Sequence, residues 1–281
     1  MKKAVVIICF IILSSSLFSQ SILPTQQEVD AFFNSKTLVV LESGMFSSYN
    51  NEIRDAFEKY WNLTPYDFIT NDEFKEKMSD STYSFLLFTQ SYYEKDKKDI
   101  HYNFLNLLLG AKYTSLSELP EIAALPLSYY EGDEENYGFK LGVIVRFFQN
   151  RAMELKEKGS LSSMKYLTYY NDFASRIKSK KLLIYEGNLQ PKLRSLKAIK
   201  EYYKYDVEIV SADALSEIVS QGADDIYFLH FVGPEGKQRS GRCFKMIFGL
   251  SDANMVYFNK HKISDKKPAG LLPSDLKRIN R

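Results

Sequence analysis

The chain has 281 residues, of which 45% are hydrophobic and 26% are charged, a balance typical of a folded protein with one large domain or two ordinary ones. Basic residues number 37 against 35 acidic ones, and Lys2 and Lys3 account for the difference. The rest of the chain is therefore neutral. That argues against nucleic acid as a partner, because phosphate binding needs a basic surface.

The first twenty residues have the pattern of a targeting segment. Lys2 and Lys3 precede an unbroken apolar run at 4–13, and small polar residues follow. The run is short for a membrane span, so we predict a Sec-type signal peptide over 1–20, cleaved near Gln20, with an uncleaved anchor as the alternative. It resembles signal sequences of Bacteroidota, which often leave Gln near the new terminus. We expect a periplasmic or secreted mature chain with no transmembrane segment.

The two cysteines indicate neither a disulfide nor a lipid anchor. Cys9 lies within the predicted leader, and the predicted cleavage site has no cysteine. Cys243 is then alone in an exported chain, within an apolar strand pattern. We expect a buried thiol, and a reactive or intermolecular thiol is the alternative.

The first half of the chain alternates strands and helices. A capping box at 25–28 starts the first helix, and four apolar residues at 38–41 predict a buried strand. Pro126 weakens the strand that contains it or places that strand at a sheet edge. Residues 139–147 alternate as a strand would, but one long helix over 137–158 that ends at Gly159 is the simpler account. We expect helices at 26–35, 53–61, 73–78 and 137–158, and strands at 38–41, 66–69, 83–88, 100–109 and 121–129.

The second half repeats this order. We expect helices at 162–179, 193–203, 212–219 and 274–279, and strands at 182–185, 207–210, 226–232, 242–249 and 254–261. Lys36–Glu42 (KTLVVLE) aligns with 180–186 (KKLLIYE), and the segments that follow also match. The alternation predicts parallel strand pairs joined by right-handed crossovers.

We therefore predict a mixed α/β (α+β) protein of two tandem, duplicated βαβαβββα domains, at 21–159 and 160–281. Each would be a mixed sheet with helices packed on it. This order of elements, with its apolar first strand and amphipathic helix, resembles the amino-terminal αβ domain of TolB-like and CsgG-like envelope proteins and the penicillin-binding-protein activator lipoproteins. The resemblance implies a non-enzymatic role in envelope assembly or regulation.

No motif in the chain indicates catalysis. His101, His230 and His261 lie in different predicted strands, and none has a second ligand at metal-binding spacing. The chain also has no P-loop, no nucleophile elbow and no dinucleotide-binding fingerprint. We predict no catalytic residue, no metal and no cofactor.

Glu42 and Glu186 are the ligand-binding candidates, because each ends the first strand of its repeat, where open αβ sheets place their sites. Common descent of the two copies is the alternative explanation for the repeated acid. The predicted hairpin tips are the other recurrent feature, since their cations would contact acidic partners or lipid head groups. These surface-contact candidates are Lys95, Lys97, Lys98, Lys237, Arg239 and Arg242.

Two functions fit these patterns. The first is an exported non-catalytic binding or scaffold protein of the bacterial cell envelope, with an envelope protein or another periplasmic partner. The alternative is a small-ligand-binding protein or hydrolase that uses an interdomain cleft, with Glu42 and Glu186 near its mouth.

Overall fold

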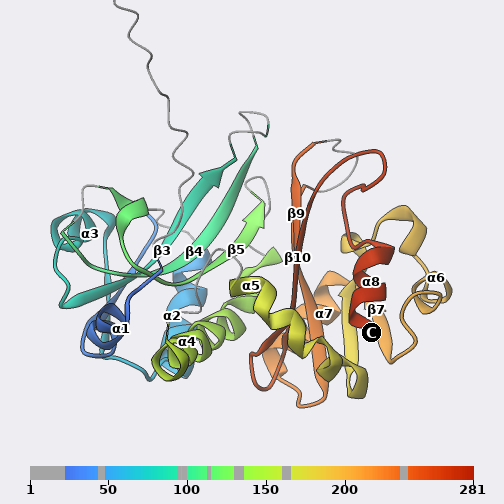
Figure 1. The fold of residues 1–281 in the computed structure, drawn as a ribbon, viewed down its shortest axis with the longest axis horizontal. Coiled ribbons are helices and arrows are strands. Elements are labelled where there is room, and N and C mark those ends of the chain that lie inside the picture. Colours follow the sequence, from blue (N-terminus) through green and yellow to red (C-terminus); the bar gives the residue numbers. More distant parts are fainter. Residues whose placement is uncertain are drawn as a thin grey trace, which may run out of the picture.

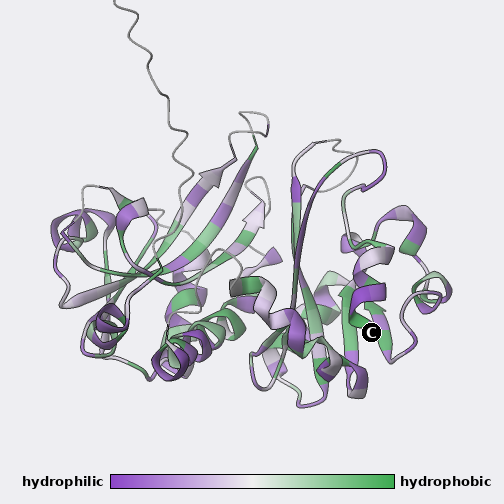
Figure 2. Cartoon of the chain, in the orientation of Figure 1, coloured by the Kyte–Doolittle hydropathy of each residue, from purple (hydrophilic) through white to green (hydrophobic). Residues whose placement is uncertain are grey.

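The computed structural model describes residues 23–43, 48–93, 96, 100–112, 115–129, 136–159, 166–234 and 240–281. It confirms the predicted fold class, because two similar units each combine a five-stranded mixed sheet with helices (Figure 1). The central strands are mainly hydrophobic, whereas peripheral helices such as α3 and α6 carry hydrophilic segments (Figure 2). The predicted leader lies outside the described residues, and the boundary between 159 and 160 stays a prediction.

The first sheet has the strand order β2-β1-β3-β4-β5. Strands β2 and β3 run parallel to β1, and β4 and β5 continue the sheet in antiparallel pairs. Strand β5 is an edge strand, as Pro126 predicted. The elements are α1 (Gln26–Phe33), β1 (Lys36–Val40), α2 (Ser48–Tyr60), β2 (Tyr66–Ile69), α3 (Asn71–Lys77), β3 (Tyr83–Tyr92), β4 (His101–Leu109) and β5 (Glu121–Tyr129).

The second sheet has the order β7-β6-β8-β9-β10, which matches the first sheet strand for strand. Its parallel pairs β6·β7 and β6·β8 and its antiparallel pairs β8·β9 and β9·β10 also match. The elements are α5 (Tyr166–Tyr169), the 3₁₀ helix η4 (Tyr170–Ser179), β6 (Lys181–Tyr185), α6 (Leu196–Lys200), β7 (Val207–Val210), α7 (Ala212–Gln221), β8 (Ile226–Val232), β9 (Arg242–Gly249), β10 (Met255–Lys262) and α8 (Pro273–Ile279).

The strand register corrects the sequence alignment by one residue. Lys36 begins β1 and pairs with Asp67 across the sheet at 3.1 Å, and Lys181 begins β6 and pairs with Glu208 at 2.9 Å. Lys36 therefore corresponds to Lys181, not to Lys180. Because Lys180 and Lys181 are adjacent, the sequence alone allows Lys36 to be aligned with either of them. The ion pairs with the neighbouring strand show which alignment is correct.

Helix ends follow from local sequence. Thr25 and Glu28 form the predicted capping box at the start of α1, and Thr70 and Glu73 form another at α3. Helix α6 begins later than predicted, because Ser195 accepts the Ala198 N–H at 3.2 Å and caps the start of the helix, and it ends at Lys200.

Helix α4 (Leu141–Lys158) follows a 3₁₀ turn (Gly138–Lys140) and contacts both units. It packs on α1, α2 and β5 of the first unit, and Phe147 meets Phe248 of the second sheet at 5.4 Å between ring centroids. One apolar core includes residues of both sheets. The helix is apolar on opposite sides because both sides are buried, which explains the strand-like alternation in its sequence.

Candidate functional site

The two predicted ligand acids lie in different settings. Glu42 lies two residues beyond the end of β1 and is half-buried, and the Asn50 amide binds both its backbone N–H and its carbonyl at 2.9 Å. The pKa of Tyr49 is raised first by burial and then by the charge of Glu42. Glu186 is exposed in a 3₁₀ turn after β6. By the corrected register, the residue equivalent to Glu186 is Leu41, so the two acids do not occupy matching positions.

Of the predicted tip cations, Lys95, Lys97, Lys98, Lys237 and Arg239 lie outside the described residues. Arg242 is described, and it faces the other hairpin of the same chain. Its Nε lies 2.9 Å from Asp96 Oδ2, and its guanidinium lies 4.2 Å from the ring centre of Tyr93. The Asp96 side chain is fully buried. Arg242 therefore joins the two units, whereas the sequence predicted an outward contact.

A buried polar cluster lies between β9, β10 and α8. Lys245 Nζ is 2.9 Å from Asp275 Oδ2, and both residues are completely buried. Asp275 Oδ1 also accepts the Tyr257 hydroxyl at 2.8 Å and the Asn259 amide at 2.6 Å, and Oδ2 accepts the Leu272 N–H at 2.9 Å. Four donors thus surround one carboxylate, which is how a buried charge is tolerated.

Lys245 and Asp275 each shift the other's pKa in the direction opposite to the shift that burial causes. Burial lowers the pKa of Lys245, and Asp275 acts against that shift. Burial alone would raise the pKa of Asp275, but Lys245 and the other donors outweigh it and hold the pKa below its ordinary value. The geometry and the directions together describe a buried ion pair at neutral pH.

His261 extends this cluster as a neutral imidazole. Burial and then Lys245 lower its pKa to about 4. Its Nδ1 accepts from Lys245 Nζ at 2.9 Å, and its Nε2–H donates to the Pro268 carbonyl at 3.0 Å. Cys243 lies nearby, and burial raises its pKa to about 11. The predicted buried thiol is confirmed, and it is kept protonated.

The first unit has apolar residues where the second has this cluster. Leu105 pairs with Phe88 and Leu125 in the first sheet, and the equivalent Lys245 pairs with Phe231 and Asn259 in the second. In the same register, Ala123 corresponds to Tyr257. Three apolar positions in one copy are thus polar in the other.

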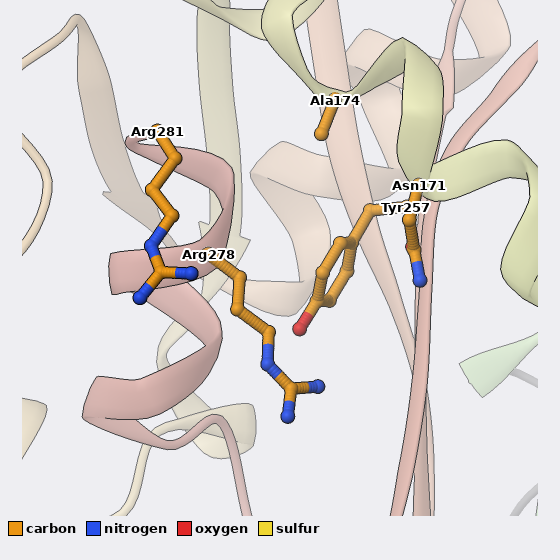
Figure 3. Close-up of a pocket in the computed structure, with 5 residues that line it drawn as sticks. All are labelled: Asn171, Ala174, Tyr257, Arg278 and Arg281. Atoms are coloured by element: carbon orange, nitrogen blue, oxygen red, sulfur yellow. The ribbon is translucent and has the colours of Figure 1, made fainter.

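A pocket of about 310 Å³ opens beside the cluster (Figure 3). It is lined by Asn171 and Ala174 of η4, Tyr257 of β10, and Arg278 and Arg281 at the end of α8. Tyr257 belongs to both, since its ring lines the pocket and its hydroxyl donates to Asp275. The position of this pocket-lining residue is therefore fixed by the buried cluster.

The sequence reasoning missed both the pocket and the cluster. Lys245 is a cation inside the apolar run of β9, between Phe244 and Met246, and such a residue signals a buried partner. Its partner Asp275 lies 30 residues further on in a short helix. No local pattern connects the two.

Within the described ranges, no group of three His, Cys, Asp or Glu side chains could hold a metal ion, and no helix is long and apolar enough to cross a membrane. No family model, curated protein or solved structure matches the chain.

Proposed function

We propose that the chain is an exported, non-catalytic binding or scaffold protein of the bacterial cell envelope. The observation that supports this most is the way α4 and two further contacts fasten the duplicated units into one body. Such a body presents fixed surfaces to a partner. Export rests on the leader-like sequence, and the envelope role agrees with the resemblance to TolB-like and CsgG-like domains.

Three polar contacts tie the units together around the shared core. The Arg146 guanidinium of α4 donates to the Leu250 and Ser251 carbonyls at 2.6 and 2.8 Å. The buried His230 of β8 donates through Nε2 to the Pro126 carbonyl of β5 at 3.0 Å. Arg242 and Asp96 join the hairpins. Contacts at separate points oppose the hinge motion that a closing cleft needs.

A small-ligand-binding role is the second candidate, and the pocket at α8 favours it. That pocket lies within the second unit, between η4, β10 and α8. Neither Glu42 nor Glu186 lines it. This version of the alternative thus places the ligand away from the interdomain cleft that the sequence suggested.

Site-specific photo-crosslinking in cells tests the scaffold proposal. The chain would carry its own leader in a Bacteroidota host, with a photoreactive residue at Tyr92 or at Leu196, whose exposed fractions are 67% and 46%. The expected result is export, together with a crosslink from one of these positions to one recurrent envelope protein. Asp213, exposed on α7, is the control position. Retention in the cytoplasm, or the same adducts from all three positions, would count against the proposal.

A further inference from the structure

We infer that the pocket between η4, β10 and α8 binds a small molecule or head group through one oxyanion, a phosphate or a carboxylate, held by Arg278. This ligand site goes beyond the proposed scaffold role and does not depend on it. It follows from the donors in the pocket, the charge around it and the comparison of the two copies.

The pocket wall presents hydrogen-bond donors. Asn171 Oδ1 accepts the Phe258 N–H at 2.7 Å, which leaves the amide Nδ2 as the group available to a ligand. Arg278 and Asn171 flank the Tyr257 ring, and the guanidinium and the amide nitrogen point the same way (Figure 3). Guanidinium groups match the planar oxygens of carboxylates and phosphates, so this arrangement suits an oxyanion.

The floor of the pocket does not repel an anion. The Tyr257 hydroxyl donates a hydrogen bond to Asp275, and Arg278 interacts with the same hydroxyl. The negative charge of Asp275 is buried beneath the Tyr257 hydroxyl, and the positive charge of Lys245 balances it. None of the five lining residues is acidic.

Cations also lie near the pocket. Lys178 Nζ donates to the Arg281 carbonyl at 2.6 Å, which places its charge beside the end of α8. The backbone N–H of Lys204 donates to Asn280 Oδ1 at 3.1 Å, so the backbone of Lys204 also lies there. Lys277 is exposed on α8. The opposing acid on η4 is Asp172, which is exposed to solvent. The excess of positive charge attracts anions toward the opening.

The duplication shows that the fold does not require the polar cluster beneath the pocket. The first unit builds the same sheet with Leu105, Ala123 and Leu125 at the positions of Lys245, Tyr257 and Asn259. A buried ion pair is often no more stabilising than apolar residues of similar size. The second unit therefore keeps a buried ion pair that the fold does not need for stability. This cluster fixes the positions of Tyr257 and α8, which line the pocket.

The volume sets the size of the ligand. About 310 Å³ is at the small end of ligand pockets, which span roughly 300–1,000 Å³. That space admits a free phosphate- or carboxylate-bearing metabolite, or the phosphate and glycerol of a lipid head group. Both sources share the same oxyanion, and the experiment separates them.

The test titrates the full chain with inorganic phosphate, glycerol 1-phosphate and acetate at constant ionic strength, followed by calorimetry. We expect saturable binding of at least one of these anions, with a Kd on the order of millimolar or tighter. Arg278→Gln should weaken it by about tenfold or more, because a charge-assisted hydrogen bond is lost. Arg278→Lys retains the positive charge, so its affinity for the anion should lie between those of the unaltered chain and Arg278→Gln. Arg194→Gln is the matched control, since Arg194 is exposed in the same unit and does not line the pocket.

Vesicles identify the source of the anion. Retention on phosphatidylglycerol vesicles but not on phosphatidylcholine vesicles, lost in Arg278→Gln, would assign the site to a lipid head group. Binding of free anions without vesicle retention would assign it to a soluble ligand. The inference is overturned if neither the anions nor the vesicles bind, or if Arg194→Gln weakens binding as much as Arg278→Gln. Circular dichroism and urea midpoints verify that each variant is folded.

Discussion

Replacing Lys245 by methionine keeps most of the side-chain length and removes its charge, which leaves Asp275 buried without its cation. Removing one partner of a buried pair costs about 3–5 kcal/mol in general. Three of the four donors to Asp275 remain in this variant: the Tyr257 hydroxyl, the Asn259 amide and the Leu272 N–H. We therefore expect the low end of that range, about 3 kcal/mol, a large part of the roughly 5–15 kcal/mol that holds a domain folded.

A second substitution separates the charge from the packing. Asp275→Asn removes the charge that Lys245→Met leaves unpaired. The double variant should therefore lose less stability than the sum of the two single variants. Lys181→Met is the matched control, because Lys181 makes the same kind of contact with Glu208 on the surface, where the side chains are 40% and 50% exposed. That change should cost less than about 1 kcal/mol.

Urea unfolding followed by two probes measures these effects. Far-UV circular dichroism reports the whole chain, and fluorescence reports Trp61, the single tryptophan, which is buried in the first unit. Because one apolar core includes both sheets, Lys245→Met should move both transitions together, although Lys245 is in the second unit. A loss no larger than that of Lys181→Met would refute the buried ion pair. A Trp61 transition that stays in place while the circular dichroism shifts would refute the coupling of the units.

Three further predictions follow from buried groups. Lowering the pH from 7 to 5 should cost about 2 kcal/mol at each of His230 and His261, because burial sets their pKa values at about 3 and about 4 and the unfolded chain takes up protons first. Stability should thus fall with pH below about 6.5, and His230→Gln or His261→Gln should flatten that dependence in urea titrations. Asp96→Asn should destabilise the chain by about 1–3 kcal/mol and leave Arg242→Gln with little further effect, since the two residues form one contact between hairpins. Cys243 should react slowly with a thiol reagent at pH 8 in the native chain and rapidly in urea, and fast native labelling would contradict its burial.

The elements of the fold were largely predictable because their signals are local. The strands β2, β5, β7, β8 and β9 have the predicted ends, since each is a mainly apolar or alternating segment bounded by turn or capping residues. The segment 162–179 was predicted as one helix, and the described part of it is a short α-helix followed by the 3₁₀ helix η4. Hydrophobic spacing indicates a helical face, but it does not distinguish tight from ordinary helical turns.

The pocket and its cluster were beyond prediction because they depend on contacts across the fold. Lys245, Tyr257 and Asp275 come from β9, β10 and α8, and each looks ordinary or only mildly unusual in its own segment. Asn171 and Arg278, which face the same pocket, are more than a hundred residues apart. Their proximity follows from the packing of η4 against both β10 and α8, which no spacing rule in the sequence reveals.

The duplication directed the sequence reasoning toward what the copies share, and that choice selected Glu42 and Glu186. The strand register removes their equivalence, and it also allows each position of one sheet to be compared with its counterpart in the other. That comparison identifies the changes from Leu105, Ala123 and Leu125 to Lys245, Tyr257 and Asn259 in two sheets of the same strand order. A shared residue in a duplicated fold is explained by common descent alone. A costly difference between the copies needs another cause, and the adjacent pocket supplies one.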